Sequence, residues 1–181
     1  MSNSSDSGRI LALNFKLGGK EGSWGIISVY GPTSQCSTDQ KDRFWNELQE
    51  TYDFFSKDQI VHVIGDFNAR VGSRRQQDCS DIQEAIGPHG LGKRNENGER
   101  LINFCIANKL RVEHTFHKHK TSQKATWFHP RFGTPGVIDM ALVQREHAKH
   151  AADIRVLPSV DTRSDHKLCR MKLIQCPDGV S

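Results

Sequence analysis

The fold of this chain is decided by the stretch Ile60-Val61-His62-Val63-Ile64-Gly65-Asp66-Phe67-Asn68. Its first five residues are mostly β-branched and apolar, which is typical of a short strand buried on both faces of a sheet. A carboxylate follows the strand, and a carboxamide comes two residues after it. At the carboxyl end of a buried strand, such groups face the crevice in which α/β sheets usually bind ligands. The stretch therefore predicts an α/β protein with a site at Asp66 and Asn68, although both residue types are also common in turns.

The flanking sequence predicts helices and further strands around this one. Ser37 and Gln40 have capping-box spacing, and the apolar residues after them recur at helical intervals, so we expect a helix over 38–57. Asn97 is expected to cap a second helix after a long loop. Strands are expected at 9–17, 24–30, 110–115, 125–128, 137–143, 152–157 and 167–173. This pattern predicts one layered α/β domain over 9–175, with a disordered lead-in at 1–8 and a tail at 176–181.

Composition narrows the class of protein. The chain has 181 residues, of which 35% are hydrophobic, enough for one domain with a core. Its five cysteines are odd in number and include no C-x-x-C pair, which argues against a zinc ribbon or a disulfide framework and favours a reducing compartment. No stretch has the length of a membrane span. We therefore expect an intracellular protein that does not contact a membrane.

Basic residues gather in the second half of the chain. The segment 109–131 contains six Lys or Arg and four His against one acid. Such a cluster favours a polyanion, while a solvated basic face is the alternative. For Trp127, packing within the sheet competes with stacking on a base. The candidate nucleic-acid-binding residues are Lys118, Lys120, Lys124, Trp127 and Arg131.

Three more candidates complete a chemical set with Asp66 and Asn68. Asp139 lies in an apolar strand, where a carboxylate is costly unless it is paired, and an imidazole is its simplest partner. Asp165-His166 can supply that imidazole, and Tyr30, at the end of its strand, can bind a phosphate or simply pack in the core. Carboxylate, amide and imidazole together suit metal-assisted attack on a phosphodiester.

Five motifs occur in one order along the chain: Tyr30-Gly31-Pro32, Gly65-Asp66-Phe67-Asn68-Ala69, Thr126-Trp127, Ile138-Asp139 and Ser164-Asp165-His166. This series resembles the endonuclease/exonuclease/phosphatase superfamily, which includes apurinic/apyrimidinic (AP) endonucleases. The segment 90–101, Gly90-Leu91-Gly92-Lys93-Arg94-Asn95-Glu96-Asn97-Gly98-Glu99-Arg100-Leu101, resembles the AP-type domains of non-LTR retrotransposons and the related craniofacial development protein 2-like group.

The resemblance implies a four-layer αββα sandwich that hydrolyses phosphodiesters with Mg²⁺ or Mn²⁺, here a DNA-nicking domain acting in the nucleus. Asp66 would orient or deprotonate the attacking water, and Asn68 and Tyr30 would hold the scissile phosphate. Asp165 would belong to the metal side of the site. His166, oriented by Asp139, would contact the phosphate and stabilise developing charge.

The chain also departs from the pattern of the family. The opening strands of the family supply an Asn and then a Glu that is the principal metal ligand, and neither has a counterpart here. We therefore expect a domain without its first strands, with weakened activity and an uncovered sheet edge prone to self-association. Ile138-Asp139-Met140 stands where the family usually reads Ile-Asp-Tyr. The alternatives are a catalytically inactive nucleic-acid-binding remnant and a phosphodiesterase acting on small molecules.

Overall fold

A six-stranded sheet forms the centre of the computed structural model, which describes residues 2–4, 7–16, 23–57, 59–160 and 162–174. The strands lie in the order β1-β2-β3-β4-β8-β5. Only the pair β3–β4 is parallel, and the other neighbours are antiparallel. The strands are β1 (Ser2–Ser4), β2 (Ile10–Lys16), β3 (Ser23–Tyr30), β4 (Gln59–Asp66), β5 (Leu110–Val112) and β8 (Asp139–Gln144).

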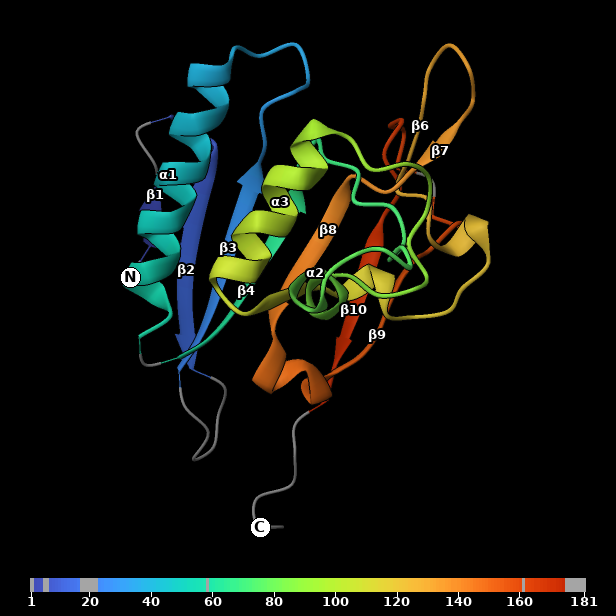
Figure 1. Cartoon of the computed structure of the whole chain (residues 1–181). Coiled ribbons are helices and arrows are strands. Elements are labelled where there is room, and N and C mark those ends of the chain that lie inside the picture. Colours follow the sequence, from blue (N-terminus) through green and yellow to red (C-terminus); the bar gives the residue numbers. More distant parts are fainter. Residues whose placement is uncertain (1, 5–6, 17–22, 58, 161, 175–181) are drawn as a thin grey trace.

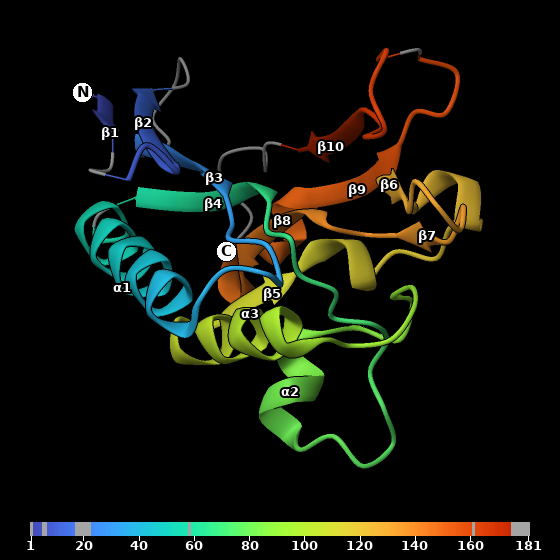
Figure 2. The ribbon, with the colours of Figure 1, turned by 90° about the horizontal axis from the view of Figure 1, so that it is seen from above.

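Three α-helices cover one face of this sheet (Figures 1 and 2). They are α1 (Thr38–Phe55), α2 (Ser80–Ala85) and α3 (Glu96–Ala107). Every second residue of each strand points to this face, so Ile27, Val61 and Leu142 meet Leu48 of α1 and Leu101 of α3 in one fully buried apolar cluster. This cluster is the core of the domain.

Helix α1 begins at the predicted place. The Ser37 side chain accepts a hydrogen bond from the Gln40 backbone N–H, and the Gln40 side chain accepts one from the Ser37 N–H, so the predicted capping box is confirmed. The expected cap of α3 was wrong by two residues. Asn95 caps the helix by accepting from Gly98, because the Asn97 side chain is held elsewhere.

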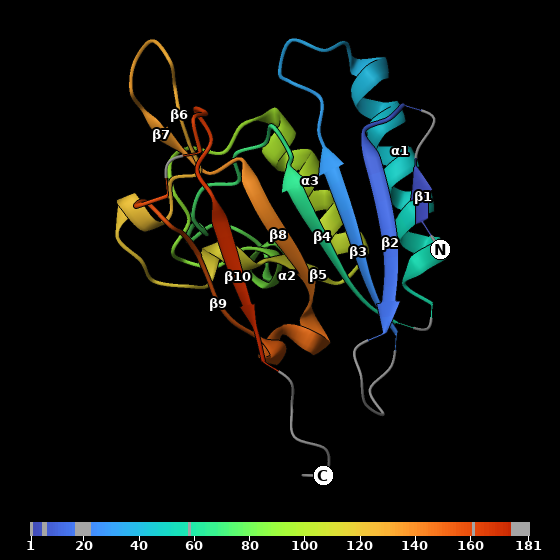
Figure 3. The ribbon, with the colours of Figure 1, turned by 180° about the vertical axis from the view of Figure 1, so that it is seen from behind.

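A small second sheet stands against the other face of the main sheet (Figures 2 and 3). It contains β9 (Ala151–Val156) and β10 (Cys169–Leu173), which pair antiparallel. A short hairpin, β6 (Trp127–Phe128) and β7 (Pro135–Gly136), lies at one end. The predicted strand at 110–115 ends early, because residues 113–115 form a 3-10 turn in which the Thr115 hydroxyl donates to the Val112 carbonyl.

These layers confirm the α/β class but fill only part of the expected four-layer sandwich. The three α-helices all lie on the same side of the main sheet (Figure 2), so within the described ranges no α-helix forms an outer layer over β9 and β10. The second sheet also leaves part of the main sheet open, and Leu11 and Leu13 of β2 are 43% and 44% exposed there. Residues 2–4, which the sequence places in a lead-in, pair with β2 as β1. The glycine-rich turn 18–22 and the tail 176–181 lie outside the described residues.

Candidate active site

Three candidate side chains stand in a row because their strands are in register. Tyr30 is the partner of Asp66 across β3 and β4, and Asp66 is the partner of Asp139 across β4 and β8. Residues paired in this way point to the same face of a sheet, which here is the face opposite the helices. Gly65 allows the ends of β3 and β4 to lie close together. Its φ is +137°, and a Cβ at this position would lie 2.1 Å from the Val29 carbonyl oxygen.

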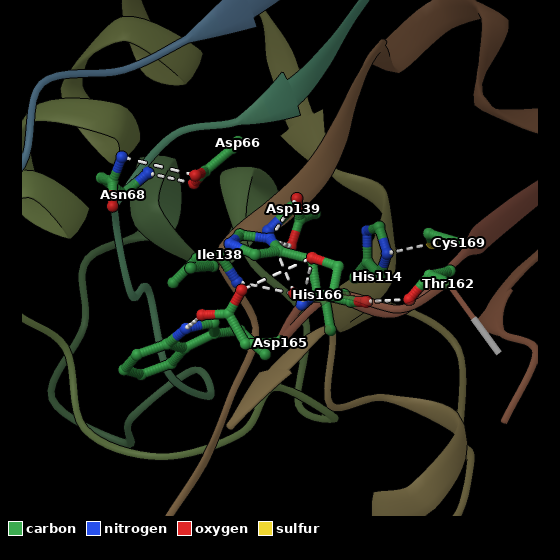
Figure 4. Close-up of polar contacts among 12 residues, drawn as sticks. Asp66, Asn68, His114, Ile138, Asp139, Thr162, Asp165, His166 and Cys169 are labelled. Atoms are coloured by element: carbon green, nitrogen blue, oxygen red, sulfur yellow. Dashed lines mark hydrogen bonds and ion pairs between the residues drawn. The ribbon is translucent and has the colours of Figure 1, made fainter. Parts of the chain in front are cut away.

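His166 joins the row from the loop before β10. Its Nδ1 lies 3.1 and 3.0 Å from the two carboxylate oxygens of Asp139, so the imidazole is the partner of the acid in the apolar strand (Figure 4). The loop is held next to β6, because the Lys167 N–H donates at 2.7 Å to the carbonyl of Thr126, the residue before that strand. With Nδ1 committed to Asp139, Nε2 is the ring nitrogen that can meet a substrate.

Asn68 is held beside Asp66 in an unusual backbone conformation. Its φ is +46°, a left-handed value that asparagine tolerates better than most residues. Its backbone N–H donates to Asp66 Oδ1 at 2.8 Å, and its Nδ2 donates to the Gly31 carbonyl at 3.0 Å. The carboxamide therefore lies between the ends of β3 and β4, next to the carboxylate (Figure 4).

Asp165 occupies the solvent side of the site. Its Oδ2 accepts a hydrogen bond from Trp127 Nε1 at 2.9 Å, and this bond holds the pKa of the exposed carboxyl below its usual range. Sequence reasoning placed Trp127 among the nucleic-acid-binding residues or in the sheet, and here its indole also orients an acid of the site.

The acids of the site repel one another. Burial raises the pKa of Asp66, and the charges of Asp139 and Asp165 raise it further, while the Asn68 N–H and His166 act in the opposite direction. Ligand atoms of Asp66, Asp139 and His166 lie within 4.8 Å of one another. Carboxylate oxygens are the donors that a hard divalent cation prefers, and its charge would relieve this repulsion. Two of the three donors are carboxylates, so the group fits a divalent metal ion, while Asp165, the predicted metal ligand, lies outside it.

A cleft of about 390 Å³ opens over these residues. The catalytic candidates that line it are Tyr30, Asp66, Asn68 and His166, while Asp139 does not reach it. Arg70, Asn95, Trp127 and His129 also line it, and of these only Trp127 was singled out from the sequence. The other nucleic-acid-binding candidates do not line it. Lys118, Lys120 and Arg131 are exposed on loops, and Lys124 donates to the His89 carbonyl.

Two buried polar residues that sequence reasoning did not assign to the site hold it in place. The Thr126 hydroxyl accepts from the backbone N–H groups of both Ile138 and Asp139, at 3.1 Å each, and so fixes the start of β8. The Asn97 side chain donates to the carbonyls of Pro32 and Asn68, at 2.9 Å each. Both contacts join segments far apart in the chain, and no local pattern signals them.

Comparison with known proteins places this site in a family. A family model described as endonuclease-reverse transcriptase matches residues 24–170. The craniofacial development protein 2 of Tragulus javanicus is 31% identical over 160 residues, which are 88% of this chain. The chain spans about a quarter of the length of that relative, 26%.

Solved structures share the fold at low sequence identity. AP endonuclease LMAP from Leishmania major is 14% identical with a TM-score of 0.63, over 91% of this chain and 54% of that one. The endonuclease domain of TRAS1, a telomere-specific non-LTR retrotransposon, is 11% identical with a TM-score of 0.59, over 96% of this chain and 67% of that one. The match of the family model over most of the chain, with the order of motifs and the fold, shows that this chain belongs to the endonuclease/exonuclease/phosphatase superfamily.

Proposed function

We propose that this domain hydrolyses phosphodiester bonds in DNA, as a nicking endonuclease that depends on Mg²⁺ or Mn²⁺. The observation that carries the proposal is the row Tyr30, Asp66 and Asp139, with His166 bound to the last of them. These side chains come from three neighbouring strands and one loop. Tyr30, Asp66 and His166 line a single cleft, and Asp139 is bonded to the imidazole of His166. A plain structural role would not require an acid, an amide, an imidazole and a phenol at one edge of a sheet.

Each side chain has a role that its surroundings suit. Asp66, with its raised pKa, is the base that orients and deprotonates the attacking water. His166 Nε2 donates to a phosphate oxygen, and Asp139 holds the ring in the required tautomer and stabilises its positive charge. The Asn68 carboxamide, by exchanging its bond to Asp66 Oδ2, and the Tyr30 hydroxyl hold the scissile phosphate, and Tyr30 is more than half exposed at the mouth of the cleft.

The metal would be held by carboxylates of the same cluster. Asp66, Asp139 and His166 each have a ligand atom within 4.8 Å of the others, and Asp165 lies outside this group. A divalent cation held there would stabilise the negative charge that develops on the phosphate oxygens.

DNA is the substrate that the relatives favour. The solved neighbours are named as an AP endonuclease and as the endonuclease domain of a retrotransposon. Arg70 and His129 at the cleft, together with Lys118, Lys120, Lys124 and Arg131 beyond it, can contact phosphates on either side of the cut. A DNA substrate would place the protein in the nucleus.

The test is nicking of supercoiled plasmid with Mg²⁺ or Mn²⁺, by the wild-type chain and by Asp66→Ala and His166→Ala. Metal-dependent nicking that both substitutions remove is the expected result. A folded wild-type chain that binds plasmid without cutting it would contradict the proposal, and would favour the non-catalytic nucleic-acid-binding reading. Binding that falls steeply with salt would then identify the phosphate contacts.

The open side of the main sheet also suggests self-association. In the described part of the chain, β10 is an edge strand of its two-stranded sheet, and Leu11 and Leu13 stay exposed on β2 of the main sheet. Unpaired strand edges next to apolar surface favour association. Sedimentation of the purified chain, with Leu11→Lys/Leu13→Lys as the disrupting variant, tests this expectation.

The helices of the described residues are all too short or too polar to span a bilayer.

A further inference from the structure

A cysteine and a histidine are in contact behind the active site, in a role that phosphodiester hydrolysis does not require. His114 Nε2 lies 3.1 Å from Cys169 Sγ, between the 3-10 turn after β5 and the first residue of β10 (Figure 4). His114 is only 6% exposed, and its Nδ1 has no hydrogen-bond partner. His114 shares the cost of a buried imidazole without a full set of partners with His62, and it differs from His62 in its contact with a thiol.

The pair faces a cavity of about 230 Å³ between the two sheets. Met171, two residues after Cys169 on the same strand, lines the cavity with them, since alternate residues of a strand share a face. Ile64, Ala141 and Ile154 make the rest of its wall largely apolar. The cavity therefore offers one imidazole, one thiol and one thioether in an otherwise apolar setting.

This donor set selects one kind of ligand. Thiolate and thioether sulfur are soft donors that favour Cu⁺ over the hard cations bound by carboxylates. A structural zinc site needs four donors, usually Cys and His. Among the described residues, the group of three His, Cys, Asp or Glu side chains that could hold a metal ion is Asp66, Asp139 and His166. His114 and Cys169 therefore have no third ligand of these four types beside them.

We propose that His114, Cys169 and Met171 form a binding site for a thiophilic monovalent cation of the Cu⁺ type. On binding, the Cys169 thiol releases its proton to solvent, a metal–sulfur bond forms, and His114 Nε2 changes from hydrogen-bond partner to ligand. The nitrogen and sulfur atoms must move apart by roughly half an ångström to reach tetrahedral ligand spacing. Cys169 is partly exposed, so the ion has a path to the site.

The site is independent of the proposed nuclease activity. Asp139 lines the same cavity, but the charge of the bound ion replaces that of the proton released by Cys169, so the net charge beside the Asp139 carboxylate does not change.

The binding test uses Ag⁺, which has the same preference for sulfur and does not change oxidation state under these conditions. The starting protein is the full chain with Cys36→Ser, Cys79→Ser and Cys176→Ser, which leaves the buried Cys105 as the other thiol. Calorimetry in chloride-free buffer should show one Ag⁺ bound per chain. In protein labelled at its three methionine methyl groups, Ag⁺ should shift the Met171 resonance and leave that of Met1 unchanged.

Variants of the three ligands decide the proposal. Cys169→Ser should weaken Ag⁺ binding by more than about 100-fold, since even indirect supports of a metal site are worth 10- to 100-fold. Met171→Leu should weaken it by about tenfold, because a thioether is a weaker donor. Cooperative melting shows which variants are folded, and His114→Asn replaces Cys169→Ser if the latter is not. Unchanged affinity in the folded variants, or a Met171 resonance that does not move, would overturn the site.

Discussion

The two faces of the main sheet come from the same strands and have opposite characters. The helix-covered face buries Val61, Val63 and Leu142 in a continuous apolar cluster. The other face carries Asp66 and Asp139, a cavity and two exposed leucines. Because the side chains of a strand alternate, one set of residues stabilises the fold while the set between them is left for chemistry. Substitutions on the two faces should therefore separate activity from stability.

The face opposite the helices, which carries Asp66 and Asp139, is called the chemical face below. The largest effect is expected on this face, from Asp66→Asn. The substitution removes the proposed base, so nicking should fall by about 100- to 10,000-fold. Stability at pH 7 should stay the same or rise, since the raised pKa of Asp66 means that its ionised form is disfavoured in the fold. Plasmid nicking and urea unfolding of the same preparation measure both. The exposed Glu50→Gln on α1 is the control, and equal loss of activity there would show that the assay reports something other than the site.

The next largest effect is expected on the helix-covered face. Leu48→Ala removes a fully buried side chain and should lower the free energy of unfolding by about 2–5 kcal/mol. Leu11→Ala makes the same chemical change at an exposed position of the other face and should cost less than about 0.5 kcal/mol. Urea unfolding measures both changes. Nicking per folded molecule should be unchanged in each, and similar unfolding energies for the two variants would refute the contrast between the faces.

A third effect is a loss of stability in acid that originates on the chemical face. His62 is buried against Trp24, neither of its ring nitrogens has a hydrogen-bond partner, and burial lowers its pKa to about 4. The unfolded chain takes up a proton near pH 6.5 and the folded chain does not, so stability is lost as the pH falls from about 6.5 to about 4.

His62→Phe should flatten that dependence. By pH 5 the histidine is expected to have cost the wild-type chain about 2 kcal/mol relative to pH 7, and phenylalanine cannot take up the proton. Melting temperatures of both proteins between pH 7 and pH 4.5 measure the difference. His114, whose pKa burial lowers to about 3, stays in both proteins, so some sensitivity remains. Parallel curves for wild type and variant would show that His62 is not the source.

The sequence predicted best what is encoded locally. Strand β4 and the acid at its end follow from a run of apolar residues and the polar residues directly after it, and the capping box at Ser37 needs only four consecutive residues. The α/β class follows from such elements. The pairing of Asp139 with an imidazole was also predictable, because an acid in an apolar strand requires a partner.

The sequence predicted least well what depends on distant segments. Asn97 was expected to cap α3, but its side chain donates to Pro32 and Asn68, while Asn95 makes the cap. Both asparagines have the chemistry of a cap, and only the tertiary position of the Gly31–Pro32 turn decides between them. The bond from Trp127 to Asp165 joins residues 38 apart and has no local signature either.

The smallest effect is expected at the place where the two faces are joined. Asn97 belongs to α3 and holds the ends of β3 and β4, next to Asn68. Asn97→Ala should lower the free energy of unfolding by about 1–3 kcal/mol, since it removes the donor of two carbonyls, those of Pro32 and Asn68. It should also slow nicking, because Asn68 loses a contact that holds it in place.

Asn108→Ala is the matched control, because Asn108 follows the same helix, bonds to Gln49 at both ends of its amide and lies outside the cleft. It should lower stability to a similar degree with no change in nicking per folded molecule. Equal nicking by both variants would mean that α3 stabilises the domain without positioning its site. Slower nicking by Asn97→Ala alone would mean that the helix-covered face, through one carboxamide, also sets the geometry of the catalytic one.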